Sequence, residues 1–164
     1  MMPQQEGTSF QLLLERRAAL AVDWLVRSIE ACGGQGSARF YSRVYEPRRG
    51  WSWPYPETTG YIIPTLYAYA RFANRPELTE LATRQADWVM SLQYDSGALP
   101  GGHVENGRKA GPSIFNTGQM IFGLVAAYDE TGQARYLDSA RRAAEWLASE
   151  VDPVRGTWTS HGYV

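Results

Sequence analysis

The chain has little of several residue types, and each shortage excludes a class of protein. One of its 164 residues is a cysteine, which excludes a disulfide framework and a metal cluster held by thiolates. The net charge is −1, so no basic excess favours nucleic acid or a membrane surface as a partner. The two histidines, His103 and His161, lie far apart in the sequence, and we expect no metal and no cofactor.

Long apolar runs are also missing. No stretch reaches the roughly 18 apolar residues that indicate a membrane span. The N-terminal segment MMPQQEGTSF has neither the basic nor the apolar region of a secretory signal. We therefore expect a cytoplasmic protein in which residues 1–8 are disordered and residues 9–164 form a single helical domain.

The stretch from Pro56 to Gly102 is followed by a second version of itself. A shift of 58 positions brings ten identical residues into one gapless register, from Thr59 on Thr117 to Ser91 on Ser149. Each unit contains two apolar helical patterns, and a repeat of this kind predicts stacked, antiparallel helical hairpins. We expect an all-α fold with five helices, near residues 9–31, 58–73, 77–93, 116–130 and 134–149.

Local signals support these helices. Thr8 or Ser9 is the expected cap of the first helix, and Pro76 is typical of the first position of the third. Pro64 lacks an amide proton and must lie near the first turn of the second helix or kink it. The tryptophans at equivalent helical positions are expected to pack in the core, and they are Trp24, Trp88 and Trp146.

Three connections are long, covering residues 32–56, 94–115 and 150–164. In an up-and-down array alternate links lie at opposite ends, so the three long connections are expected on one face. The N-termini of the second and fourth helices open onto the same face and make it mildly electropositive. Within the first connection, the alternation over residues 39–45 favours a short strand or hairpin arm.

The aromatic content is high at 13%, with six Trp and ten Tyr, and much of it falls in these connections beside arginines. Sugar rings stack on indole and phenol rings, and arginine binds carboxylate or phosphate. The face therefore suits saccharides, including anionic ones. The candidate substrate-binding residues are Tyr41, Arg43, Trp51, Trp53, Tyr61, Asn116, Gln119, Trp158 and His161. The loop tryptophans could instead cover the end of the helical core without contacting a ligand. Asn116 is equally typical of a helix N-cap.

Acid–base chemistry on a sugar requires two titratable groups on one face. The candidate catalytic residues are Glu57, at the start of the second helix, with His103 and Glu105 in the glycine-rich second connection. Each has a plainer interpretation. Glu57 is also a typical helix-capping carboxylate, and His103 and Glu105 are also typical of an exposed polar loop.

The segments Pro56-Glu57-Thr58-Thr59-Gly60-Tyr61 and Asn116-Thr117-Gly118-Gln119, and the pattern from Trp88 through Gln93 to Asp95 and Gly97, resemble the α/α-toroid proteins. That superfamily includes six-hairpin glycosidase-like proteins, uronyl-epimerase-like domains and terpenoid cyclases with prenyltransferases. The first two segments are most similar to uncharacterised polysaccharide-biosynthesis members. The resemblance implies concentric helices, with the second and fourth inner, and a cleft at the N-termini of the inner helices. A full toroid needs about twelve helices, so this chain is expected to form part of one.

Three functions remain as hypotheses. The first is a carbohydrate-binding or carbohydrate-active protein of bacterial polysaccharide metabolism. The second is a non-catalytic helical module that completes a toroid with another subunit or a second copy. The third is an isoprenoid-handling protein, although the aspartate-rich motif of terpenoid cyclases is absent. Because apolar helices flank both ends of the predicted array, we also expect a homodimer or a chain completed by another subunit.

Overall fold

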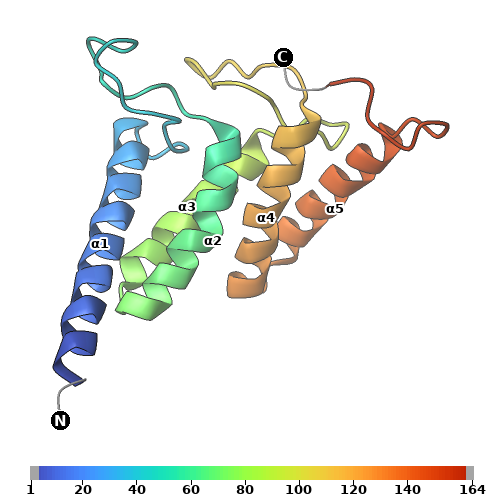
Figure 1. The fold of residues 1–164 in the computed structure, drawn as a ribbon. Helices are drawn as coiled ribbons and strands as arrows, with labels where there is room; N and C mark the ends of the chain where they lie inside the picture. Colours follow the sequence, from blue (N-terminus) through green and yellow to red (C-terminus); the bar gives the residue numbers. More distant parts are fainter. Residues whose placement is uncertain (1–3, 162–164) are drawn as a thin grey trace.

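The computed structural model describes residues 4–161. Within that range the chain is all-helical, with five helices: α1 (Gln4–Ala31), α2 (Pro56–Ala73), α3 (Pro76–Ser91), α4 (Ile114–Thr131) and α5 (Ala134–Ser149). Figure 1 shows the three long connections gathered at one end of these helices and the two short links at the other. No helix between residues 4 and 161 combines the length and apolar character that crossing a bilayer requires.

The two short links reverse the chain at residues that adopt left-handed backbone conformations. Asn74 ends α2 with φ 52° and Gly132 ends α4 with φ 68°, and each donates its N–H to a carbonyl of the last helical turn. Pro76 then occupies the first position of α3, as expected, because its missing N–H would have no partner there. The predicted helix ends at Asn74, Pro76 and Gly132 lie within one residue of the observed ends.

Helices α2 and α4 pack directly against each other through glycine. A Cβ atom on Gly60 would lie 2.8 Å from the Cα of Met120, and one on Gly123 would lie 2.5 Å from the carbonyl oxygen of Gly60. Pro64 lies inside α2 and offers no N–H, so the Gly60 carbonyl lacks its usual helical donor and faces Gly123 instead. The pair of glycines is what allows this close approach.

The core is built where α3 and α5 flank this central pair. Leu66, Leu78, Leu124 and Tyr136 are fully buried in one continuous apolar cluster drawn from all four helices. The phenol of Tyr136 donates to Asp87 at 2.8 Å, which satisfies its polar end at the edge of the core. Trp146 is buried as predicted, and Trp88 is half-buried against the cluster.

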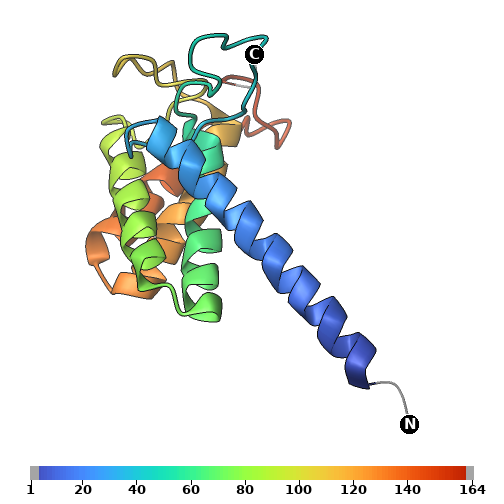
Figure 2. The same ribbon diagram turned by 90° about the vertical axis from the view of Figure 1, so that its left-hand side faces the viewer.

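Helix α1 differs from expectation in where it begins and in the exposure of Trp24. It begins at Gln4 rather than at Thr8 or Ser9, since Gln and Glu are good helix formers, so residues 4–8 are helical; residues 1–3 lie outside the described range. Val22 and Ile29 contribute to the core. Trp24, however, is 44% exposed and is not the core residue that was predicted. Figure 2 shows that α1 also diverges from the other helices towards its N-terminus.

The first long connection forms no regular strand. Residues 39–45 were expected to form a strand or hairpin arm, but isolated antiparallel bridges are found instead, joining Ala38 to Pro54 and Tyr41 to Trp51. The connection therefore folds back on itself. The buried hydroxyl of Ser52 holds the fold by accepting from the backbone N–H groups of Arg39 at 2.9 Å and Phe40 at 3.3 Å.

Candidate functional site

Backbone hydrogen bonds join the three long connections to one another. The N–H of Val104 donates to the carbonyl of Pro54 at 2.9 Å, and the N–H of Ile114 donates to the carbonyl of His161 at 2.9 Å. The Nδ1 atom of His103 lies 3.2 Å from the carbonyl oxygen of Trp53. Side chains far apart in the sequence are thereby held in fixed relation at the connection end of the molecule.

Ser113, rather than Asn116, caps α4. The Ser113 hydroxyl accepts from the N–H of Asn116, which places Asn116 in the first helical turn. The side chain of Asn116 is fully buried, and its oxygen accepts from the same hydroxyl at 3.1 Å. Its Nδ2 has no hydrogen-bond partner, which is unusual for a buried amide and costs about 1–3 kcal/mol.

A first cavity, of about 390 Å³, lies beside this turn, and we call it the Tyr55 cavity. Its side-chain lining includes the ring of Tyr55, the imidazole of His103, Asn116 and the guanidinium of Arg39. The His103 and Tyr55 rings meet edge to face at 5.0 Å, and the Arg39 guanidinium lies 5.0 Å from the centre of the Tyr55 ring. Aromatic and polar groups thus line one concavity at the N-terminus of α4.

A second cavity, of about 320 Å³, is the more aromatic one, and we call it the Trp51 cavity. Trp24, Phe40, Trp51 and Tyr61 contribute to its wall, with hydroxyl groups from Ser28, Thr58 and Thr65. The Trp24 and Trp51 rings lie 4.6 Å apart between centres, so the first connection is packed on α1 here. Arg39 lines this cavity as well as the Tyr55 cavity, so it is a residue common to the two.

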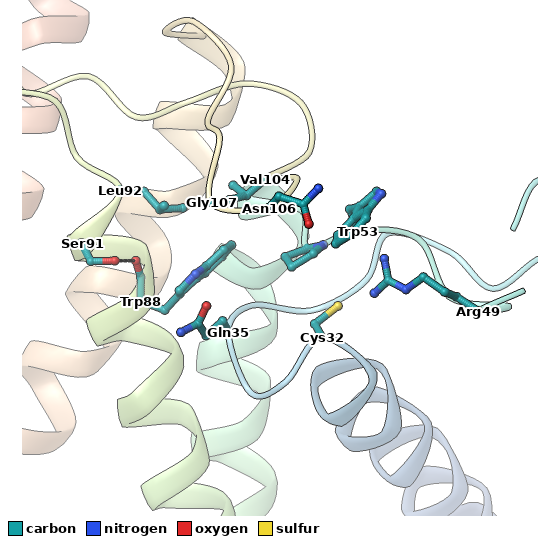
Figure 3. Close-up of a pocket in the computed structure, with 11 residues that line it drawn as sticks. Cys32, Gln35, Arg49, Trp53, Trp88, Ser91, Leu92, Val104, Asn106 and Gly107 are labelled. Carbon is teal, nitrogen blue, oxygen red and sulfur yellow. Dashed lines mark hydrogen bonds between the residues drawn. The ribbon is translucent and has the colours of Figure 1, made fainter.

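A third cavity, of about 330 Å³, lies on the other side of the first connection, and we call it the Trp53 cavity. Figure 3 shows Trp53 and Arg49 on one side of it and Trp88 on the other, with Cys32 and Gln35 below. The Arg49 guanidinium lies 4.0 Å from the centre of the Trp53 ring. Trp51 and Trp53, two positions apart in sequence, therefore line different cavities.

The three candidate catalytic residues do not share a cavity. Glu57 is 8% exposed in the first turn of α2, where its carboxylate accepts from the Tyr61 hydroxyl at 2.7 Å. Glu105 is exposed in a tight turn, bonded through its backbone to Arg108. His103 lines the Tyr55 cavity, whereas Glu57 and Glu105 line none of the three cavities.

The candidate substrate-binding residues divide in the same way. Trp51 and Tyr61 line the Trp51 cavity, Asn116 lines the Tyr55 cavity and Trp53 lines the Trp53 cavity. The others line none of these cavities. They are Tyr41 and Arg43, which bond to each other at 3.0 Å; half-buried Gln119; Trp158, whose indole donates to the Leu147 carbonyl at 2.8 Å; and His161, 3.6 Å from the Glu150 carboxylate.

Sequence reasoning missed Arg39 and Tyr55 as site residues. Tyr55 immediately precedes the helix-opening Pro56, and Arg39 begins the alternating segment of the first connection. Both positions carried a local signal, but only the fold of the connection shows that the two side chains meet. Within the described part of the chain, no group of three or more His, Cys, Asp or Glu side chains is arranged to hold a metal ion.

Comparisons of the chain with protein families, curated proteins and solved structures find no match in any of the three. The resemblance to α/α-toroid proteins therefore stays a prediction.

Proposed function

We propose that the protein binds a saccharide across the Tyr55 cavity and the Trp51 cavity. The observation that carries this proposal is that one residue, Arg39, lines both cavities. Each cavity has a volume at the lower end of the range for small-molecule sites, about 300–1,000 Å³. Two such cavities on either side of one arginine suit a ligand made of linked rings more than a single compact molecule.

The chemistry of the two walls differs in the way that saccharide recognition requires. In the Trp51 cavity, indole and phenol rings offer flat apolar faces for the C–H face of a sugar. In the Tyr55 cavity, the imidazole of His103 offers a polar group for hydroxyls. Asn116 is fully buried, so its unpaired Nδ2 is closed to a ligand in this conformation.

The charges favour a saccharide with an acidic group. Arg39 carries a fixed positive charge between the cavities, and the N-termini of α2 and α4 add partial positive charge at the same end. We propose a ligand from bacterial polysaccharide metabolism and a cytoplasmic site of action. Because Glu57 and Glu105 line neither cavity, the geometry supports binding rather than the two-carboxylate mechanism of glycoside hydrolysis.

The test compares two exposed arginines of the same connection. A glycan array with the wild-type protein identifies a ligand, and calorimetry then measures its affinity for Arg39→Gln and Arg43→Gln. We expect Arg39→Gln to weaken binding about tenfold or more, since a charged hydrogen-bonding partner is lost. Arg43→Gln, which lines neither cavity, is the matched control and keeps the wild-type affinity. Equal losses in both variants, or no glycan bound at all, contradict the proposal.

For the architecture, we propose that the five helices are part of an α/α toroid, with α2 and α4 in the inner layer. The direct packing of α2 on α4 through Gly60 and Gly123, with α3 and α5 flanking them, supports this arrangement. An experimental structure of the assembled protein tests it, because a toroid requires further hairpins to continue the same curvature beyond α1 or α5.

A second candidate function, association with another subunit, rests on α1. This helix has a stripe of exposed apolar side chains at helical spacing, formed by Phe10, Leu13, Leu14, Leu20 and Trp24. Phe10 is 62% exposed, and such a patch favours association. We propose a second copy of the chain as the partner. Sedimentation equilibrium should show a dimer that Leu13→Glu with Leu20→Glu dissociates, while Val44→Glu, an exposed change in the first connection, leaves it intact. A wild-type monomer contradicts this candidate.

A further inference from the structure

The Trp53 cavity is separate from the proposed saccharide site and differs from it in character. Part of its wall is apolar, formed by Trp53, Pro54, Trp88, Leu92 and Val104, and the rest carries polar groups such as Gln35, Ser91 and Asn106. Figure 3 shows the guanidinium of Arg49 directed inward from one side, below the Trp53 ring. A cavity with two indole rings, other apolar groups and a single cationic group suits a molecule that has an apolar body and one negative charge.

The charge of Arg49 is not met by the protein. No ion pair between residues 4 and 161 includes it. Its Nη2 makes one long hydrogen bond, 3.4 Å, to the Ala31 carbonyl at the end of α1, and its Nη1 is shielded from solvent without a hydrogen-bond partner. The guanidinium is partly shielded and has no paired counter-charge within residues 4–161, so nearby anions are attracted to it more strongly than they are in water.

The Cys32 thiol, which lines the same cavity, does not supply the missing charge. Burial raises the pKa of the Cys32 thiol to about 11, against the opposing effect of Arg49, so the thiol stays neutral at physiological pH. The guanidinium is also held in place, because it stacks on the Trp53 ring at 4.0 Å. A planar cation fixed by stacking is preorganised to meet a carboxylate.

We propose that the Trp53 cavity binds a small carboxylic acid with an apolar body. The carboxylate faces the Arg49 guanidinium, and the body lies against the rings of Trp53 and Trp88. The amides of Gln35 and Asn106, which also line the cavity, are available to the second carboxylate oxygen. This site is independent of the saccharide proposal, because Arg39, Tyr55 and Trp51 do not line it.

The first experiment uses the unmodified protein with benzoate as the probe. Benzoate should bind with saturable heat in calorimetry, and benzamide, which has the same ring without the charge, should bind at least about tenfold more weakly. In a ¹⁵N-labelled sample, the indole signals of Trp53 and Trp88 should shift with benzoate, while that of Trp146, which does not line this cavity, should not. No benzoate binding, or equal binding of benzamide, overturns the proposal.

The second experiment compares neighbouring arginines. Arg49→Gln should weaken benzoate binding about tenfold or more, and Arg48→Gln, an exposed arginine that does not line the cavity, should not change it. Arg49→Lys keeps the charge without the planar fork and should bind with intermediate affinity. Unchanged affinity in Arg49→Gln overturns the proposal. If Arg49→Gln does not fold, the indole shifts and the benzamide comparison in the wild type still decide the question.

Discussion

The helical pairs α2–α3 and α4–α5 have the same lengths and spacing, yet their equivalent residues meet different surroundings. Every boundary of α4 and α5 lies 58 positions after the matching boundary of α2 and α3. Gly60 is pressed against the backbone of α4, whereas its counterpart Gly118 meets only the tip of Leu147 at 4.0 Å. Leu78 and Tyr136 occupy equivalent buried positions, but only Tyr136 brings a hydroxyl.

The connections that follow the two pairs differ even more. After α3, the side-chain amide of Gln93 donates to the carbonyls of Gly97 and Ser139 at 2.9 Å each, which ties the second connection to α5. The positions equivalent to Gln93 and Gly97 after α5 are Val151 and Arg155, which offer no such bonds. The comparison teaches that helix boundaries follow local sequence, while the contacts of a helical pair depend on which neighbour lies beside it.

The largest effect is expected from adding one methyl group at each of the equivalent glycines. Gly60→Ala should lower the free energy of unfolding by about 3 kcal/mol, because its Cβ would overlap backbone atoms of Gln119 and Met120 that cannot rotate away. Gly118→Ala should instead raise it by about 0.5–1 kcal/mol, since alanine favours the helix and has open space. Urea titration of both variants measures the two changes in the free energy of unfolding. If both changes had the same sign, the two helical pairs would not differ at these glycines.

Gly97→Ala should lower the free energy of unfolding by a smaller amount, about 2 kcal/mol. Gly97 has φ 94°, and a Cβ there would overlap the carbonyl oxygen of Arg142, although a connection relaxes more easily than a helix. Gly156→Ala is the control, because Gly156 also has a positive φ but has nothing within 4 Å. Thermal unfolding should therefore show Gly156→Ala as the milder change. If both variants lose the same stability, then backbone strain alone, and not contact with α5, explains why position 97 requires glycine.

Gln93→Leu should lower the free energy of unfolding by about 1.5 kcal/mol, because two carbonyl groups lose their donor where the second connection meets α5. Gln133→Leu, at an exposed position before α5, should change stability by less than about 0.5 kcal/mol. Chemical denaturation measures both. If the two variants prove equally stable, then the bonds of Gln93 do not distinguish the two connections.

The smallest effect concerns Tyr136, where the equivalent residue of the first pair is Leu78. Burial and the hydrogen bond to Asp87 raise the pKa of Tyr136 to about 12. In the unfolded chain this phenol ionises near its ordinary pKa of about 10. Its contribution to the free energy of unfolding is therefore complete below pH 10 and is lost as the pH rises towards 12.

Tyr136→Phe should therefore lower stability by about 1 kcal/mol at pH 8, and the difference from wild type should shrink between pH 10 and 12. Urea unfolding at several pH values measures this dependence. A difference that stays constant to pH 12 would show that the hydroxyl is not the relevant group.

The helices were predictable because their signals are local. Apolar periodicity, together with Asn74, Pro76 and Gly132, predicted all five helices within a few residues, except for the start of α1. The exposure of Trp24 was not predictable, because its match to Trp88 and Trp146 does not fix which side of α1 the other helices cover.

The cavities were not predictable for a related reason. The shape of the first connection depends on the hydroxyl of Ser52 and on contacts with the second connection, and neither follows a sequence period. Trp51 and Trp53 were grouped because they are close in sequence, although they line different cavities. The chemical character of the connection end was correctly anticipated as aromatic and rich in arginine. Its division into separate cavities required the structure.

The divergence of α1 has a consequence for how the molecule opens. Val22 and Ile29 anchor the C-terminal half of the helix, whereas Phe10 and Leu13 are exposed. The N-terminal half is therefore held mainly by its own backbone hydrogen bonds, and a free helix of this length is marginal in water. In the isolated chain its amides should exchange with solvent through fraying, turn by turn, at rates unrelated to global unfolding, while amides near Ile29 should exchange only with the core.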